Sequence, residues 1–243
     1  MAARRGLHSP GKLIAARMTT NFRLLGITHF AILAAVPLLA VALAVVQCRL
    51  LPGKRHLRFA LGILLLADSA WWYAYLISLG QPLFPGQLPL ELCDITLLLI
   101  ALELLTLNLL LFDLAYYWAL AGTSMALLTP NLWEHFPSLA TVQFFAAHGL
   151  VVAATLYLVW SRLARPRPGS VWRALLAVNI FAAIVGTFDA IFKTDYMYLR
   201  TKPENMSLLT YLGPWPWYIA SGEVVAFVLF LLLYLPFWRR QHN

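Results

Sequence analysis

Long apolar runs, separated by short polar segments, constrain the fold of this chain more than any other feature of its sequence. They cover about residues 28–48, 58–79, 89–108, 112–129, 138–161, 171–192 and 217–237. Each run is close to the roughly 20 residues that a helix needs to cross about 30 Å of hydrocarbon. Only 12% of the residues are charged and the mean hydropathy is +0.74. We therefore predict an all-α, polytopic membrane protein with a bundle of seven transmembrane helices.

The same pattern divides the chain into three parts. We expect a basic N-terminal tail at residues 1–27, the seven-helix bundle at residues 28–238 and a short C-terminal tail at residues 239–243. No small-residue cleavage site precedes a soluble domain, so the N-terminal tail is not predicted to be a signal peptide.

The net charge of +8 lies in the loops and tails. In a membrane protein such charge indicates topology, so we predict no nucleic-acid partner. Most of the basic residues follow the first, fifth and seventh runs: Arg49, Lys54, Arg55, Arg58, Arg162, Arg165, Arg167, Arg173, Arg239 and Arg240. Because basic loops favour the cytoplasm, we expect a protein of the cell (inner) membrane with its N-terminus outside and its C-terminus cytoplasmic.

Three other loops would then share the outer face. They read GQPLFPGQ at 80–87, PNLWEHFP at 130–137 and KTDYMYLRTKPENMSLLTYLGPWP at 193–216. These loops are rich in aromatic residues, Pro and Gly. A functional site should therefore open toward this face.

Polar side chains inside the apolar runs are costly, at about 2.5–3.5 kcal/mol for a charged group, so they should face the bundle interior. They are Asp68, Glu91, Cys93, Asp94, Glu103, His148, Asn179, Asp189 and Glu223. They could join helices by hydrogen bonds, and Asp189 could pair with Lys193 four residues on. Alternatively, residues from several helices converge on one polar chamber, supported by Glu91, Asp94, Asp189, Asp195 and Glu223.

Cys93 and His148 are the candidate catalytic residues of this chamber. Each could equally be a packed core residue, since a membrane Cys is usually a small packer. A zinc hydrolase needs about three ligands and only one His lies deep in a run, so we predict no metal and no cofactor.

The segment GPWPWYIASGE, residues 213–223, precedes and opens the last run. Trp215, Trp217 and Tyr218 have the chemistry of interface anchors. Alternatively they form a rigid lid over the chamber, with Glu223 pointing into it.

Four stretches carry a resemblance to a known family. They are LPLELCD, YYWALAGTSMALLTPNL, the run from FP to QFFAAHGL, and DYMYLRTKPENMSLLTYLGPWPWYIASGE. Together they resemble the YwaF-like bacterial integral membrane proteins, which are similar to eukaryotic transmembrane protein 164. The resemblance implies a seven-helix bundle and an acyltransferase that moves a fatty acyl chain between phospholipids and lysophospholipids. It places the Cys and His of that activity at Cys93 and His148.

The sequence departs from the bacterial pattern of this family at three positions. Glu91 stands where a His is usual, Asp195 where an Asn is usual and Met125 where a Gln is common. The first departure matters most, because a Glu cannot supply the positive charge that would activate a nearby thiol.

The mechanism that the resemblance implies is acyl transfer. His148 would accept the thiol proton of Cys93, and Cys93 would form an acyl-thioester that a lysophospholipid hydroxyl then takes. Glu91 and Asp94 are either protonated or one of them orients His148. Two other classes stay open: a small-molecule transporter or binding protein that uses the chamber, and a membrane scaffold without catalysis.

Overall fold

The computed structural model describes residues 22–132, 134, 136–203 and 207–238, and every regular element in them is helical. The helices are α2 (Ile27–Val45), η1 (Val46–Leu50), α3 (His56–Ser78), α4 (Leu92–Thr106), α5 (Leu109–Tyr117), η2 (Trp118–Thr123), α6 (Ser124–Leu128), α7 (Leu139–Trp160), α8 (Ser170–Phe192), η3 (Tyr196–Tyr198), η4 (Leu208–Tyr211) and α9 (Trp217–Trp238). The predicted all-α class is therefore confirmed. The tails at residues 1–21 and 239–243 lie outside the described residues.

Each predicted run contains a helix whose ends lie within about one turn of the predicted ends. Six of these helices are long and apolar enough to cross a membrane: Ile27–Leu50, His56–Ser78, Leu109–Leu128, Leu139–Trp160, Ser170–Phe192 and Trp217–Trp238. The remaining helix, α4, has 15 residues and spans only about 22 Å. Seven full spans are thus not confirmed.

The ends of α4 explain why it is short. Pro89 disfavours a helical conformation at Leu88, and the helix begins only at Leu92, three residues after the predicted start at 89. At the other end Leu107 has a left-handed conformation, with φ 53°. The side chain of Asn108 then caps α5 by accepting a hydrogen bond from the Leu110 N–H at 2.9 Å.

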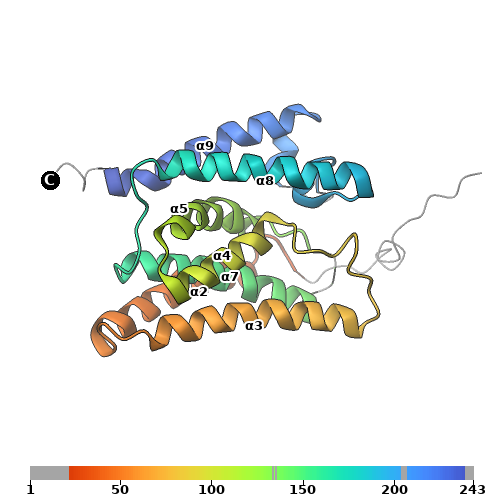
Figure 1. The fold of residues 1–243 in the computed structure, drawn as a ribbon. Coiled ribbons are helices and arrows are strands. Elements are labelled where there is room, and N and C mark those ends of the chain that lie inside the picture. Colours follow the sequence, from red (N-terminus) through yellow and green to blue (C-terminus); the bar gives the residue numbers. More distant parts are fainter. Residues whose placement is uncertain (1–21, 133, 135, 204–206, 239–243) are drawn as a thin grey trace, which may run out of the picture.

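Helix α4 lies inside the bundle, where it contacts α3, α5, α7 and η2. Its side chains Ile100 and Leu104 are fully buried in the main core. Helix α2 packs against α7, and α8 and α9 lie as a pair over α5 (Figure 1). The first turn of α4 is thereby enclosed between neighbouring helices and the loops that connect them.

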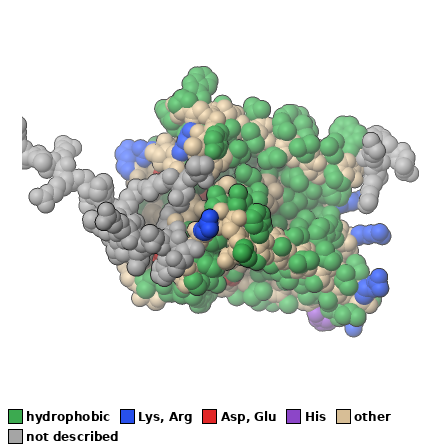
Figure 2. Space-filling view, turned by 180° about the vertical axis from the view of Figure 1, so that it is seen from behind, with side chains coloured by type: hydrophobic (Ala, Val, Ile, Leu, Met, Phe, Trp, Pro, Cys, Tyr) green, Lys and Arg blue, Asp and Glu red, His purple; other side chains and the backbone are tan. Residues whose placement is uncertain are grey.

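The surface has an apolar wall between two polar ends. Figure 2 shows hydrophobic side chains over the length of the helices, with Lys and Arg near the ends. Ile63, Leu176, Ile184 and Val228 are among the exposed apolar side chains. We name the end with η1 and residues 161–169 the basic end, and the end with residues 79–91, 129–132, 136–138, 193–203 and 207–216 the loop end. This distribution is that of a multi-pass membrane protein. Which end faces the cytoplasm stays a prediction.

An acidic residue at the basic end joins α5 to the start of α8. Asp113 is fully buried, and its two oxygens accept hydrogen bonds from the Arg167 N–H and Nε at 2.9 and 2.8 Å. Arg173 Nη2 donates to Oδ2 of the same carboxylate at 2.8 Å. The Arg residues that indicated topology in the sequence therefore also neutralise a charge inside the bundle.

Candidate functional site

The candidate site is built at the first turn of α4, where Glu91, Cys93 and Asp94 lie. Glu91 has the extended backbone of a helix N-cap, but its side chain makes no capping hydrogen bond. The side chain reaches across the bundle, and its Oε2 accepts a hydrogen bond from the Met197 N–H at 2.9 Å. Glu91 thus joins the start of α4 to the loop after α8.

That loop, residues 193–201, crosses over the start of α4, and we name it the strap. Tyr196 is its central anchor: its hydroxyl donates to the Pro85 carbonyl at 2.7 Å and accepts from the Leu88 N–H at 2.8 Å. These bonds, with that of Glu91, fix the strap to the segment that leads into α4. The segment that contains the predicted outer loop 80–87 is therefore bonded to residues 196 and 197 of the predicted outer loop 193–216.

Two predicted chamber residues hold the strap in shape. Asp189 accepts hydrogen bonds from the Thr194 hydroxyl at 2.6 Å and from the Tyr196 N–H at 3.0 Å. Asp195 accepts from the Arg200 N–H at 2.9 Å. Lys193 directs its ammonium to the Ala190 carbonyl at 2.9 Å and donates its backbone N–H to the Asp189 carbonyl, so among the described residues it forms no ion pair with the Asp189 carboxylate.

The backbone of the strap is strained. Met197 and Tyr198 both have left-handed conformations, with φ of 54° and 55°, which cost a non-glycine residue about 1–2 kcal/mol each. Contacts on both sides of Tyr198 stabilise this conformation: Asn131 Nδ2 donates to its hydroxyl at 3.0 Å, and the Tyr218 hydroxyl donates to its carbonyl. Such over-determined strain is typical of functional sites.

The predicted lid residues divide between the strap and the surface. Tyr218 is buried and contacts the strap through its hydroxyl. Trp215 donates its indole N–H to the Leu199 carbonyl at 3.1 Å while the ring stays exposed. Trp217 is exposed, as expected for an interface anchor.

Several side chains come close enough to the Cys93 thiol to interact with it electrostatically. They are Glu91, Asp94, Thr123 and Tyr198. The Thr123 hydroxyl from η2 is buried next to the thiol, without the geometry of a regular hydrogen bond. Tyr73 from α3 interacts with both carboxylates. We name Tyr73, Glu91, Cys93, Asp94, Thr123 and Tyr198 the polar cluster.

The tyrosines of the strap are neutral donors at physiological pH. Burial is the main cause that raises the pKa of Tyr196 and of Tyr198 above the ordinary value of 10, and the nearby Glu91 carboxylate raises both further. Both hydroxyls therefore keep their protons; that of Tyr196 is donated to the Pro85 carbonyl, and that of Tyr198 can be donated to a carbonyl or ester oxygen.

His148 lies on α7, which packs against both α4 and η2. Its Nδ1 is 2.8 Å from the Phe144 carbonyl and its ring lies 4.1 Å from the Phe144 ring. A carbonyl only accepts, so Nδ1 carries the proton and Nε2 keeps its lone pair, as a general base requires. Among the described residues, His148 contacts Phe144 and Cys93 interacts with the polar cluster, and no hydrogen bond joins these two candidate catalytic side chains.

The other intramembrane polar residues form separate contacts between helices. Gln143 donates to Asp68 at 3.1 Å and joins α7 to α3, and Asn179 donates to Glu223 at 2.9 Å and joins α8 to α9. Glu103 is fully buried toward the basic end, where Arg58 is its nearby cation. The structure thus brings Glu91, Cys93, Asp94, Asp189 and Asp195 together, but bonds Glu223 elsewhere. The described residues hold no group of three or more metal-ligating side chains.

Sequence reasoning missed Asp113 and the aromatic and hydroxyl members of the site. Asp113 lies in the apolar run LLLFDLAYY, where a charge predicts a buried partner, and the nearby Arg-rich loop could have supplied it. Tyr73, Thr123 and Tyr198 carry no comparable signal, because Tyr and Thr are common throughout membrane helices and their interfaces.

The fold and the polar cluster define a multi-pass helical membrane protein with a half-buried thiol site beneath its loop end. The sequence matches the TMEM164 family over residues 24–234, and the chain belongs to that family. It is also similar to a protein of Treponema pallidum (strain Nichols) that is described as uncharacterized, at 27% identity over 221 residues, 90% of this chain and 91% of the relative. No solved structure matches the chain. The resemblance to transmembrane protein 164 is confirmed, whereas the YwaF-like branch stays a prediction.

Proposed function

We propose that this protein is a phospholipid acyltransferase that forms an acyl-thioester on Cys93. The observation that carries the proposal is the place of this thiol: the first turn of a short helix inside the bundle, beneath a strained strap, in a chain of the TMEM164 family. Lipid reaches the apolar wall of the bundle, and the site lies below its loop end. A nucleophile in this position can meet an ester bond at the membrane interface.

Cys93 and His148 share no hydrogen bond among the described residues, so the first half of the reaction requires their side chains to approach each other when lipid binds. His148 Nε2 then accepts the Cys93 thiol proton and the sulfur attacks the carbonyl carbon of a phospholipid ester. The ester C–O bond breaks, and His148 returns the proton to the leaving oxygen. A lysophospholipid departs and the acyl chain stays on sulfur. In the second half, His148 accepts the hydroxyl proton of an acceptor lysophospholipid, whose oxygen attacks the thioester. The thiol leaves and regains its proton, so no oxidant or reductant is needed.

The start of α4 supports a thiolate at Cys93. The N–H groups of the first turn have no acceptor within the helix, and the helix dipole places partial positive charge at this end. Cys93 is the second residue of α4, within reach of that charge. Asp94 opposes the thiolate when it is ionised, so we expect it to hold a proton during attack.

In this proposal Glu91 has a structural role and is not a catalytic base. Its carboxylate accepts the Met197 N–H and thereby closes the strap over Cys93. Where the bacterial pattern of the family has a His, this chain has a residue that fastens the strap. We propose that His148 alone supplies the base here.

Acyl transfer in proteoliposomes tests this function. With a phospholipid that carries a labelled acyl chain and an unlabelled lysophospholipid, the wild-type protein should form labelled phospholipid from the acceptor. His148→Gln should lower the rate by roughly 10²–10⁴-fold, the usual effect of losing a general base. His56→Gln is the matched control, because His56 is exposed at the basic end.

The outcomes separate the alternatives. No transfer by folded wild-type protein would contradict the acyltransferase and favour the scaffold. Transfer that His148→Gln leaves at the wild-type rate would exclude His148 as the base while leaving the activity standing.

A further inference from the structure

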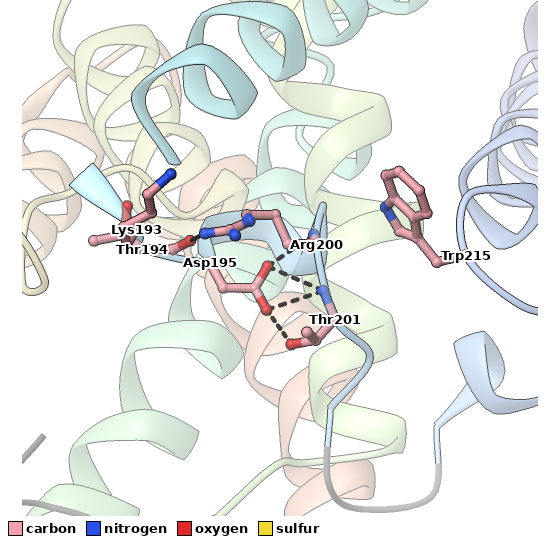
Figure 3. Close-up of a pocket in the computed structure, with 6 residues that line it drawn as sticks. All are labelled: Lys193, Thr194, Asp195, Arg200, Thr201 and Trp215. Atoms are coloured by element: carbon pink, nitrogen blue, oxygen red, sulfur yellow. Dashed lines mark hydrogen bonds between the residues drawn. The ribbon is translucent and has the colours of Figure 1, made fainter. Parts of the chain in front are cut away.

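A cavity lies on the loop end, on the outer side of the strap. It is an open depression of about 450 Å3, lined by Lys193, Thr194, Asp195, Arg200, Thr201 and Trp215. Figure 3 shows the strap residues on one side of this pocket and Trp215 facing them from the other. None of its residues belongs to the polar cluster, so the pocket is a separate site on the same loop.

The cations of the pocket are positioned to meet an anion. Arg200 Nη1 donates to the Asp189 and Thr194 carbonyls at 3.3 and 3.2 Å, which fixes the guanidinium. Its other nitrogens make no hydrogen bond to the described residues, and Lys193 uses its ammonium for a single carbonyl. Arg200 therefore presents a preorganised fork of donors, the group that best matches phosphate oxygens.

The carboxylate of the pocket is turned to its own loop. Asp195 accepts hydrogen bonds from the N–H groups of Arg200 and Thr201 and from the Thr201 hydroxyl. These donors stabilise its charge without using either cation. With Lys193 and Arg200 against one carboxylate, the pocket keeps a net positive charge.

The position of the pocket indicates the source of the anion. Lys193 directly follows α8 and Trp215 precedes α9, so the pocket lies where two helices end at the loop end. Exposed Trp side chains at helix ends mark the membrane interface, where lipid phosphates lie. In a phospholipid the ester bonds lie between the phosphate and the acyl chains. A phosphate on the outer side of the strap leaves the ester on the side of the polar cluster.

We propose that this pocket binds the phosphodiester group of the phospholipid donor, an inference that rests on the proposed function. The strap then has two faces. Arg200 and Lys193 bind the phosphate on the outer face, and Met197 and Tyr198 close over Cys93 on the inner face. The ligand class is a lipid with a phosphate head, and the pocket itself does not select among the acyl chains.

Binding is measured on the Cys93→Ala protein in detergent, so that no turnover interferes. Isothermal titration calorimetry compares three ligands. They are dihexanoylphosphatidylcholine, inorganic phosphate and dihexanoylglycerol, the last of which lacks a phosphate. Arg200→Gln and Lys193→Gln should each weaken binding of the phosphatidylcholine about tenfold or more, because each removes a charged donor. Arg23→Gln, which removes an exposed cation elsewhere on the loop end, should leave it unchanged.

Lys193→Gln should not disturb folding, because it removes only one hydrogen bond, to an exposed carbonyl. Thermal unfolding measures whether both variants keep the stability of the parent protein. Dihexanoylglycerol should bind weakly and equally to every variant. Lipid binding at wild-type strength in both variants would overturn the proposal. So would tight binding of inorganic phosphate without binding of the lipid, which would identify a free-anion site.

The transfer assay separates this proposal from the proposed function. If wild-type protein transfers no acyl chain but binds the lipid through Arg200 and Lys193, the acyltransferase fails and the pocket stands. If transfer occurs and Arg200→Gln and Lys193→Gln change neither binding nor KM, the pocket fails and the acyltransferase stands.

Discussion

Replacement of Cys93 by alanine should lower acyl transfer by roughly 10³-fold or more, because the nucleophile itself is removed. Without the sulfur no thioester forms, and the neighbouring carboxylates and hydroxyls cannot supply a nucleophile of similar strength. The thiol is small and partly exposed, so alanine should leave the fold intact. The measurement is the initial rate of labelled phospholipid formation in proteoliposomes.

The chain offers its own matched control in its second cysteine. Cys48 is an exposed free thiol in η1 at the basic end, about the length of a membrane helix from Cys93. Cys48→Ala should transfer at the wild-type rate. Equal loss in both variants, or full activity in Cys93→Ala, would contradict the assignment of the nucleophile.

Replacement of Asp113 by alanine should lower the free energy of unfolding by about 2–3 kcal/mol, because it removes several hydrogen bonds to a buried charged group. The carboxylate is fully buried and accepts hydrogen bonds from two arginines and one backbone N–H. Its loss removes these hydrogen bonds, while the half-exposed Arg167 and Arg173 side chains can turn to water. Since these contacts join α5 to α8, the variant should also weaken the attachment of the α8–α9 pair.

The effect is measured by thermal or denaturant unfolding in the same detergent for all variants. Asp68→Ala is the control, because its carboxylate accepts one side-chain hydrogen bond, from Gln143. A single hydrogen bond contributes only about 1 kcal/mol. If Asp113→Ala loses no more stability than Asp68→Ala, the contacts of Asp113 with Arg167 and Arg173 do not stabilise the fold as proposed.

The sequence predicts the helices well because long apolar runs have few alternatives in a membrane. It does not predict that α4 is short, because apolar composition is the same for a helix that faces lipid and for one enclosed by other helices. The start of α4 depends on Pro89 and on the bonds of Tyr196 to Pro85 and Leu88. Those acceptors and donors are backbone groups, which every residue carries, so no sequence pattern reveals them.

The candidate site was predictable only in its carboxylates and its thiol. Glu91, Cys93 and Asp94 stand out in an apolar run, and the structure places them together at the first turn of α4. The role of Glu91 could not be predicted from the sequence, because its hydrogen-bond partner is the Met197 N–H, about a hundred residues away. The left-handed strap at Met197 and Tyr198 is likewise a result of packing and carries no glycine signal.

The most direct test of the central proposal is the mass of Cys93 itself during the reaction. Wild-type protein is mixed with phospholipid in the absence of a lysophospholipid acceptor, quenched in acid, digested and examined by mass spectrometry. The predicted result is one acyl chain on the peptide that contains Cys93, removed by neutral hydroxylamine and absent from the Cys48 peptide. Transfer at the full rate with no acyl group on Cys93 would contradict the thioester mechanism.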